Sequence, residues 1–144
     1  MTPGAARSLI EGTTLAWSVD PDNDVVWAGP FEGRWGIRVA QRARDFTTIW
    51  FDFGDLTVGL EAYLLPDPAH HHEEVYRYCL ARNRSAWPAS ISLEHEGDLY
   101  VRTRVPLDDL TVEALDRAVG TMYETVELSF RTLVGLGFAR EKSG

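Results

Sequence analysis

Residues 48–64 read TIWFDFGDLTVGLEAYL, and the alternation in this stretch decides the fold. Apolar residues occupy every second position on both sides of Gly54-Asp55, as in two half-buried antiparallel strands joined by a hairpin. A two-residue turn at Gly54-Asp55, with a positive φ at the glycine, pairs Phe51 with Val58 on the inward face. A slip of one residue would turn one strand's apolar side chains toward water, so the pattern favours a single register.

The polar face of this hairpin carries the candidate partner-binding residues, which are Trp50, Tyr63, Glu61 and Asp52. In the expected register Trp50 lies across from Gly59. A large aromatic side chain on an otherwise polar face is typical of an interface anchor. The alternative is that Trp50 packs over the bare backbone of Gly59 or under the first helix, and the sequence leaves both interpretations open.

The same alternation predicts further strands at residues 25–27, 35–40, 90–94 and 99–105. A three-residue loop at 96–98 keeps the apolar sides of the last two strands together and pairs Leu93 with Val101. The predicted sheet therefore contains five or six antiparallel strands.

Three helices are predicted, at about 5–14, from 67 to about 83, and from about 111 to the glycines at 135–137. Asp67 is the expected N-cap of the second helix, and Val75, Cys79 and Leu80 lie on its apolar face. The third helix has an apolar stripe typical of a helix that crosses a sheet. The predicted fold is α+β: helix, three antiparallel strands, helix, two antiparallel strands and a long C-terminal helix in a two-layer sandwich.

Composition argues against several classes of function. The 144 residues carry a formal net charge of -8, which repels phosphate backbones and argues against nucleic-acid binding. No apolar run approaches the roughly 18 residues of a membrane span, and residues 1–16 lack the apolar core of a signal peptide. We therefore expect a cytoplasmic protein that does not bind membranes. Cys79 is the only cysteine, so no internal disulfide is expected, and we interpret this residue as a small buried apolar group.

The sequence HHHEE at residues 70–74 is the strongest candidate for metal binding. Consecutive helical residues point about 100° apart, so the three imidazoles cannot converge on one ion. Tyr76 also stands where a zincin helix has its second histidine. We expect no metal site and no cofactor, and we keep a small-molecule or metal-responsive sensor that uses the His70–Glu74 cluster as the alternative function.

The settings that catalysis requires are missing from the sequence. No Gly-x-Ser-x-Gly elbow surrounds a serine, and no glycine-rich loop precedes a helix. Asp52 and Glu61 share a strand face, but carboxylates on a wet sheet face are commonplace. Arg38, Arg102 and Arg104 are interpreted as partners of neighbouring acids rather than as a nucleic-acid site. We expect a protein that is not an enzyme and has no catalytic residues.

Three segments carry a resemblance to a known family. They are Leu64-Leu65-Pro66 with His72-Glu73-Glu74-Val75-Tyr76-Arg77 and Arg82-Asn83; Glu96-Gly97-Asp98-Leu99-Tyr100 with Arg104-Val105-Pro106-Leu107; and Leu115-Asp116, Tyr123-Glu124, Ser129-Phe130 and Leu133. Together with Gly33-Arg34-Trp35 they resemble the YbjN family, specifically its actinobacterial branch, and the order of elements resembles the type III secretion chaperones. The resemblance covers about residues 33–138, within a single domain of residues 1–144 in which residues 1–30 match poorly and residues 139–144 form a tail.

The resemblance implies a small, acidic, dimeric protein that holds protein segments and turns nothing over. The family is associated with stress and sensory regulation, and it supplies no catalytic residues. We therefore expect a non-enzymatic protein-binding domain, chaperone- or regulator-like, linked to stress or sensory regulation. It would form a homodimer and bind a protein partner or client, with Trp50, Tyr63, Glu61 and Asp52 at the contact.

Overall fold

The computed structural model describes residues 1–139, which form three helices, one 3-10 turn and a six-stranded sheet. The helices are α1 (Pro3–Val19), α2 (His72–Ala86) and α3 (Val112–Phe138), with the turn η1 at Leu107–Asp109. The strands are β1 (Val25–Phe31), β2 (Arg34–Ala40), β3 (Phe46–Phe53), β4 (Thr57–Leu65), β5 (Ser90–Leu93) and β6 (Leu99–Pro106). The predicted α+β fold is confirmed, and the short strand predicted at 25–27 is present as β1, so that four strands rather than three precede α2.

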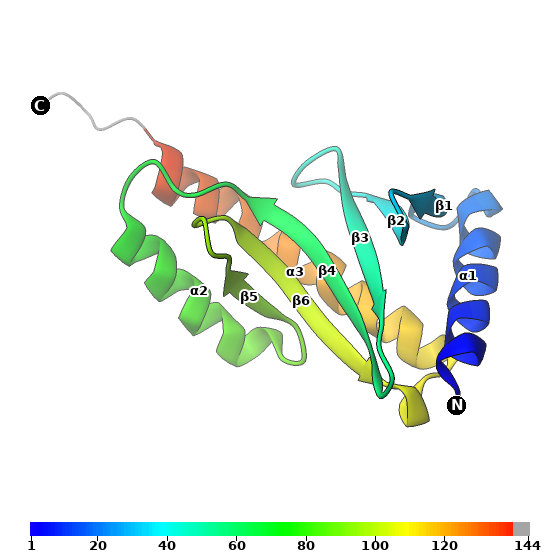
Figure 1. Cartoon of the computed structure of the whole chain (residues 1–144). Coiled ribbons are helices and arrows are strands. Elements are labelled where there is room, and N and C mark those ends of the chain that lie inside the picture. The colour runs from blue at the N-terminus through cyan, green and yellow to red at the C-terminus, as the bar shows by residue number, and fades with distance from the viewer. Residues whose placement is uncertain (140–144) are drawn as a thin grey trace, which may run out of the picture.

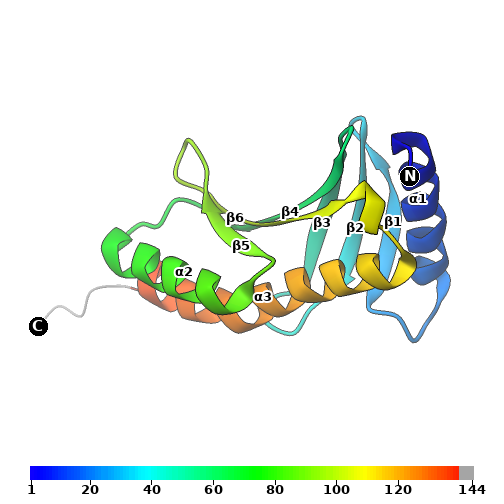
Figure 2. The same cartoon turned by 90° about the horizontal axis from the view of Figure 1, so that it is seen from below.

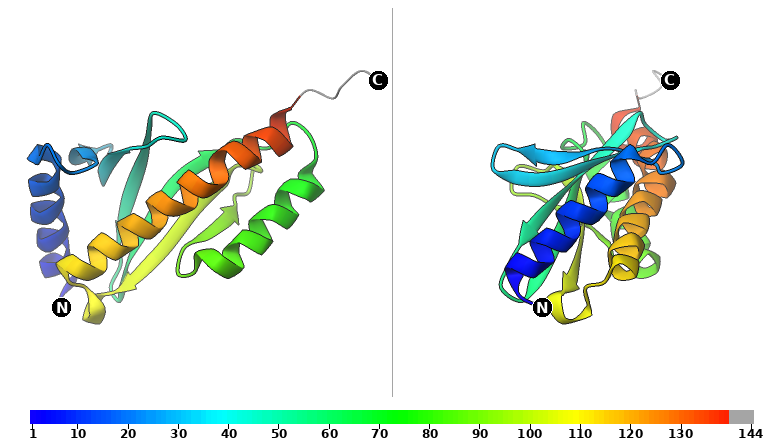
Figure 3. Two further views of the ribbon diagram at one scale, coloured as in Figure 1. Left: turned by 180° about the vertical axis from the view of Figure 1, so that it is seen from behind. Right: turned by 90° about the vertical axis from the view of Figure 1, so that its right-hand side faces the viewer.

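The sheet is antiparallel throughout and has the strand order β1-β2-β3-β4-β6-β5. Helix α3 runs diagonally across one face of it, with α1 near the β1 end and α2 near the β5 end (Figures 1 and 3). Figure 2 shows α2 and α3 along the same side of the sheet and α1 at its β1 end. Helix α1 packs on that same side, where Thr14 accepts a hydrogen bond from the indole N–H of Trp35, an inward residue of β2, at 3.0 Å. The opposite face therefore carries no helix among the described residues, and we call it the open face.

The core lies between α3 and the inward side chains of the strands. The inward residues of β3 and β4 alternate with outward ones as predicted. In the predicted stripe of α3, Phe130 is half-buried and the other five residues are buried: Leu115, Val119, Met122, Val126 and Leu133. Thr111 caps α3 by accepting a hydrogen bond from the N–H of Ala114 at 3.0 Å. The core thus follows from the two periodicities in the sequence, two in the strands and 3.6 in the long helix.

The predicted register of the β3–β4 hairpin is wrong by two residues. Phe51 faces Leu60 rather than Val58, because the strands are joined by a longer turn that includes Leu56, whose exposed fraction is 81%. Gly54 is not among the glycines with positive φ, so the expected turn type is also wrong. A shift of two residues leaves every side chain on its own face, so alternation alone could not detect it.

The β5–β6 hairpin shows the same kind of error. Its loop has three residues as predicted but lies one position earlier, at 95–97, since the N–H of Glu94 donates to the carbonyl of Asp98 at 2.8 Å. Leu93 therefore faces Leu99 and not Val101. Gly97 adopts a φ of 96°, which favours glycine at this position.

Helix α2 begins four residues later than predicted, since its N-cap is His71 and not Asp67. Asp67 instead contacts the ring of His72 at 3.0 Å, and its N–H donates to a carboxylate oxygen of Asp98 at 3.0 Å. These contacts tie the segment before α2 to the β5–β6 loop. Leu80, predicted on the apolar face, has an exposed fraction of 72%, because the contact with α3 uses Val75 and Cys79.

Both elements at the beginning of the chain are longer than predicted. Helix α1 starts at Pro3, where the side chain of Thr2 accepts the N–H of Ala5 at 3.1 Å. Strand β1 extends to Phe31 and turns into β2 through Glu32-Gly33, both at positive φ. At the other end of the chain, α3 continues to Phe138, beyond the predicted stop at 135–137.

Candidate protein-binding face

The structure places the four predicted residues together on the open face. Trp50 and Asp52 come from β3, and Glu61 and Tyr63 come from β4. Trp50 lies directly across from Glu61, and Asp52 lies across from Gly59. The predicted pairing of Trp50 with Gly59 is therefore wrong, although the face is right.

Trp50 packs on the neighbouring strand β2 rather than standing free. A Cβ atom at Gly36 would come within 2.6 Å of Cζ3 of Trp50, so the indole lies on bare backbone at this position. The guanidinium of Arg34 lies 5.5 Å from the indole centroid, and the ring of Phe31 lies 6.1 Å from it. Trp50 is half-buried, and its exposed surface belongs to an aromatic group shared with Phe31.

Charged side chains form a row across the open face. Arg34 on β2 contacts Asp52 at 3.1 Å and Glu61 at 2.8 Å. The other oxygen of Glu61 contacts Arg102 on β6 at 3.1 Å, and Arg102 also pairs with Glu94 after β5. We call these five residues the ion-pair row. The expectation that Arg38, Arg102 and Arg104 pair with neighbouring acids is confirmed for Arg102 alone. It is wrong for Arg38, whose guanidinium lies 4.4 Å from the ring centroid of Phe46, and for Arg104, and neither of them forms an ion pair within residues 1–139.

Electrostatics within the ion-pair row keep both arginines charged. Burial alone would lower the pKa of Arg34, but its hydrogen bond to Glu61 and the charges of Asp52 and Glu61 outweigh burial and raise the pKa. Burial likewise acts to lower the pKa of Arg102, and its hydrogen bonds to Glu94 and Glu61 raise it overall. Asp52 and Glu61 both accept hydrogen bonds from Arg34.

Two tyrosines lie beyond the ion-pair row, toward the β5 end. Tyr63 and Tyr100 meet edge to face with ring centroids 5.6 Å apart, and the exposed fraction of Tyr63 is 42%. Burial is the largest cause of the raised pKa of each phenol. Both hydroxyls are therefore neutral donors at physiological pH, beside apolar ring surface.

A hollow of about 340 Å³ interrupts the open face over Gly59. It exists because glycine places no side chain between Asp52 and Arg104, which lie across from it on the two neighbouring strands. Two acidic and two basic side chains line the hollow, those of Asp52, Glu61, Arg102 and Arg104. The open face as a whole therefore combines half-exposed aromatic rings with paired charges, which is the composition of a protein contact surface.

The histidines of residues 70–74 point to separate partners. His72 contacts Asp67 at 3.0 Å, whereas His71 approaches Glu74 at 3.9 Å. The rings of His70 and His71 have centroids 6.2 Å apart. Among residues 1–139, no group of three or more histidine, cysteine or acidic side chains is arranged to hold a metal ion.

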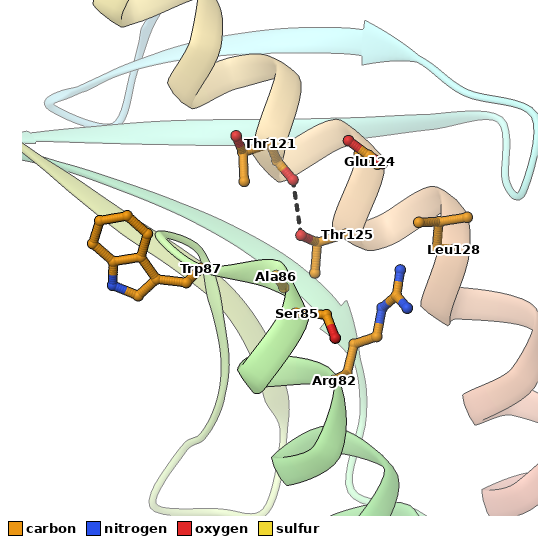
Figure 4. A pocket seen from close by; sticks show the side chains of 8 residues that line it. All are labelled: Arg82, Ser85, Ala86, Trp87, Thr121, Glu124, Thr125 and Leu128. Atoms are coloured by element: carbon orange, nitrogen blue, oxygen red, sulfur yellow. Dashed lines mark hydrogen bonds between the residues drawn. The ribbon is translucent and has the colours of Figure 1, made fainter.

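A residue that the sequence did not single out is Trp87, which follows the last turn of α2 and has an exposed fraction of 82%. A cleft of about 150 Å³ between α2 and α3 opens beside it, lined by Arg82, Thr121 and Glu124 among others (Figure 4). In Figure 4 the indole points away from the α3 side of the cleft. In the sequence, Trp87 follows the predicted second helix and precedes Pro88. This pattern predicts the end of a helix but not an exposed binding residue.

Three solved protein complexes contain a chain with the same fold, and one of them is from the type III secretion system of Pseudomonas aeruginosa. This chain resembles a chain of the ExsC–ExsE complex with a TM-score of 0.60 and 13% identity, over 92% of this chain and 96% of that one. It resembles a chain of the HopA1–SchA chaperone–effector complex with a TM-score of 0.58 and 15% identity, over 88% and 92%. For the ExoU–SpcU complex of Pseudomonas aeruginosa the TM-score is 0.56 at 16% identity, over 90% and 98%. These similarities establish the fold as that of the secretion-chaperone class.

Sequence relatives occur in mycobacteria. An uncharacterized protein of Mycobacterium leprae is 37% identical over 92 residues, which cover 64% of this chain and 50% of that protein. An uncharacterized protein of Mycobacterium bovis is 33% identical over 85 residues, which cover 59% of this chain and 46% of that protein. This chain therefore spans about half the length of these relatives.

No helix in residues 1–139 is long and apolar enough to cross a membrane.

A family model matches most of the chain. It covers residues 14–134 and is that of YbjN, described as "Putative bacterial sensory transduction regulator". The match begins within α1 and ends in the last turns of α3, so it includes the whole sheet. This protein belongs to the YbjN family.

Proposed function

We propose that this protein is a non-enzymatic binding domain that recognises a segment or surface of another protein through its open face. The observation that carries the proposal is a whole sheet face without a covering helix, on which half-exposed aromatic rings flank the ion-pair row. Paired charges of this kind give orientation and specificity, and aromatic rings give affinity. The candidate contacts remain Trp50, Tyr63, Glu61 and Asp52, to which the structure adds Phe31.

The two outer edges of the sheet favour recognition by the face over addition of a strand at either end. Phe31 and Arg34 close a two-residue turn and form a hydrogen-bonded pair. Hydrogen-bonded and non-hydrogen-bonded pairs alternate along an antiparallel ladder, so the backbone of the preceding residue, Pro30, faces outward. Proline has no N–H to donate to an added strand. At the other end, the side chain of Asn83 bonds both the N–H and the C=O of Ile91. The outermost strands, β1 and β5, are therefore blunted at Pro30 and Ile91 in the way that proteins avoid unwanted strand pairing.

We propose that this protein-binding role is chaperone-like or regulatory. The solved complexes of the same fold pair a small chain with another protein, and one of them is described as a chaperone–effector complex. The family description names sensory transduction regulation. We extend the proposal to stress or sensory regulation, to a cytoplasmic location and to a homodimer. Light scattering at micromolar concentration tests the dimer, which a monomeric mass would contradict.

Comparative capture of partners tests the proposed binding face. Tagged protein and a variant with Phe31→Ser and Tyr63→Ser would be incubated with extract of the source cells, and retained proteins quantified by mass spectrometry. A partner should be enriched by the parent chain and reduced about tenfold by the variant, as expected when two anchors are removed. Leu56→Ser, an exposed change in the β3–β4 turn, is the matched control and should retain the partner. Equal retention by all three chains would argue against the open face.

A further inference from the structure

Strand β6 extends beyond its neighbour β5 and leaves part of its edge without a paired strand. β6 has 8 residues and β5 has 4, and their pairing ends at Arg102 opposite Ser90. Figure 1 shows β6 continuing past the loop that joins α2 to β5. The residues from Thr103 to Pro106 therefore have β4 on one side and no strand of the described chain on the other.

The hydrogen-bonding groups along this edge follow from the register. Ile91 directs its N–H and C=O to Asn83, away from β6, so its neighbours in β5 are the residues that bond β6. Arg102 accordingly bonds β5, and Arg104 is the next residue of β6 whose backbone faces the same side. The unpaired edge thus presents the N–H and C=O of Arg104 and the C=O of Pro106.

A groove of about 420 Å³ lies beside this edge, between β6, the first half of α3 and the Trp87-Pro88 segment. We call it the edge groove. Ala114 and Ala118 of α3 line it, and their small side chains leave room for the side chains of an added chain. Trp87, largely exposed, stands at the α2 end of the groove. An exposed tryptophan beside a mainly apolar groove is typical of a binding anchor.

The charges of the edge groove complement an acidic ligand. Arg104 and Arg117 both line it, and neither forms an ion pair with any residue of the described chain. Asp109 is the one acidic residue among those that line the groove. The side chain of Arg104 projects to the open face. In a strand added beside β6, the residue directly across from Arg104 would project to the same face. The residues before and after it in that added strand would project to the opposite face, toward Ala114 and Ala118.

We propose that the edge groove binds an extended segment of another protein with the pattern apolar–acidic–apolar, which adds to β6 as a short strand. The acidic side chain pairs with Arg104, the two apolar side chains lie over α3, and Trp87 packs against one end. This inference rests on the proposed function, since it names the chemistry of a partner segment, but it concerns a second surface. A second copy of the chain is the poorer occupant, because a two-fold axis at the groove would bring the arginines of both copies together.

A titration with a synthetic peptide tests the edge groove directly. The probe is a capped peptide with a valine–glutamate–valine centre flanked by threonines, added to the isotopically labelled whole chain and followed by NMR. The amide signal of Arg104 and the indole N–H signal of Trp87 should shift together. Trp87→Ala should weaken binding about tenfold, with little effect on folding because the side chain is exposed. Arg104→Glu should reverse the preference, so that a lysine-centred peptide binds better than the glutamate-centred one.

Three results would overturn the edge groove. The first is an absence of shifts at Arg104 and Trp87 up to about 1 mM peptide. The second is equal binding of a peptide whose central residue carries an N-methyl group, since that peptide cannot complete the backbone pairing. The third is a dimer that Trp87→Ala dissociates, which would place a second copy at the groove. The variant with Phe31→Ser and Tyr63→Ser should bind the peptide normally, so failure of the open face and failure of the groove are separable.

Discussion

The indole of Trp50 lies on the backbone of Gly36, with only 2.6 Å between Cζ3 and the position that a Cβ atom at residue 36 would occupy. The two residues face each other across β2 and β3. The absence of a side chain at Gly36 therefore allows Trp50 to lie flat on the sheet. A tryptophan held in this way presents a fixed apolar surface and loses little side-chain entropy when a partner binds.

Gly36→Ala should destabilise the protein and displace Trp50 from β2. The new methyl group would overlap the indole, and overpacking of this kind costs roughly 1–3 kcal/mol of unfolding free energy. Gly59→Ala is the matched control on the same face, because its Cβ would lie 3.6 Å from Cβ of Asp52, an ordinary contact. Urea unfolding of both variants gives the comparison. Equal stability of the two would show that Trp50 moves aside freely.

Glu61 links the two arginines of the ion-pair row, so Glu61→Gln should cost more than Asp52→Asn. Glu61 contacts Arg34 at 2.8 Å and Arg102 at 3.1 Å, whereas Asp52 contacts only Arg34. We expect a loss of about 1 kcal/mol of unfolding free energy for Glu61→Gln and less than about 0.5 kcal/mol for Asp52→Asn. The difference should shrink in 1 M salt, where charges are screened within about 3 Å. An effect that does not change with salt would contradict the ionic origin.

The two faces of the sheet were predictable from the sequence, but the register within each hairpin was not. Alternation has a period of two, so it assigns each side chain to a face of the sheet. The same assignment results when the pairing register shifts by two residues, so alternation cannot distinguish the two registers. That shift is what separates the predicted partner of Phe51, Val58, from the observed one, Leu60. For the same reason, Trp50 does not lie across from Gly59 as predicted. Trp50 packs instead on Gly36, which belongs to the β2–β3 pair.

The start of α2 and the exposure of Trp87 depend on contacts distant in sequence. Asp67 followed by Pro68 is a good local helix start, but the N–H of Asp67 donates to Asp98 in the β5–β6 loop. Tertiary contact therefore overrides the local signal. Trp87 lines the edge groove because β5 begins only at Ser90, as predicted, and α3 lies beside the end of β6 that β5 leaves unpaired. The alternation within the strands carries no information about this position of α3.

Glu127→Ala should loosen the loop between β2 and β3. The carboxylate of Glu127 on α3 accepts the N–H of Ala43 at 3.0 Å and a side-chain N–H of Gln41 at 3.0 Å. Loss of the acceptor leaves the N–H of Ala43 without a protein partner, whereas Gln41 keeps the carbonyl of Tyr123 at 3.1 Å. An unsatisfied donor costs roughly 1–3 kcal/mol of unfolding free energy when it is shielded from water. Hydrogen exchange at the amide of Ala43 should accelerate. Glu124→Ala, an exposed change on the same helix, should leave that amide unchanged.

Asn83→Ala should expose the outer edge of β5. Its side chain accepts the N–H of Ile91 at 2.6 Å and donates to the carbonyl of Ile91 at 3.0 Å, so the substitution frees both groups at once. We expect faster hydrogen exchange at Ile91 and a greater tendency to associate at high protein concentration, because an unpaired edge invites strand pairing. Arg84→Ala is the neighbouring control, at an exposed position. Unchanged exchange at Ile91 would mean that water replaces the amide without cost.

Cys79 should make stability depend on pH in the alkaline range. Burial raises the pKa of its thiol from 9.0 to about 11, so the folded protein keeps the neutral thiol while the unfolded chain ionises. The stabilisation is complete below pH 9 and is lost as the pH rises toward 11, by about 2–3 kcal/mol in all. Burial also raises the pKa values of Tyr63 and Tyr100, whose alkaline effect is common to parent and variant.

Comparison with Cys79→Ala isolates the thiol. The variant should be less stable at pH 8, because its smaller side chain leaves space in the core, but its unfolding free energy should fall less between pH 9 and 11. Urea unfolding at intervals across that range measures both slopes. Parallel curves would show that the thiol ionises equally in the folded and unfolded chains, and that α2 opens readily from α3 around Cys79.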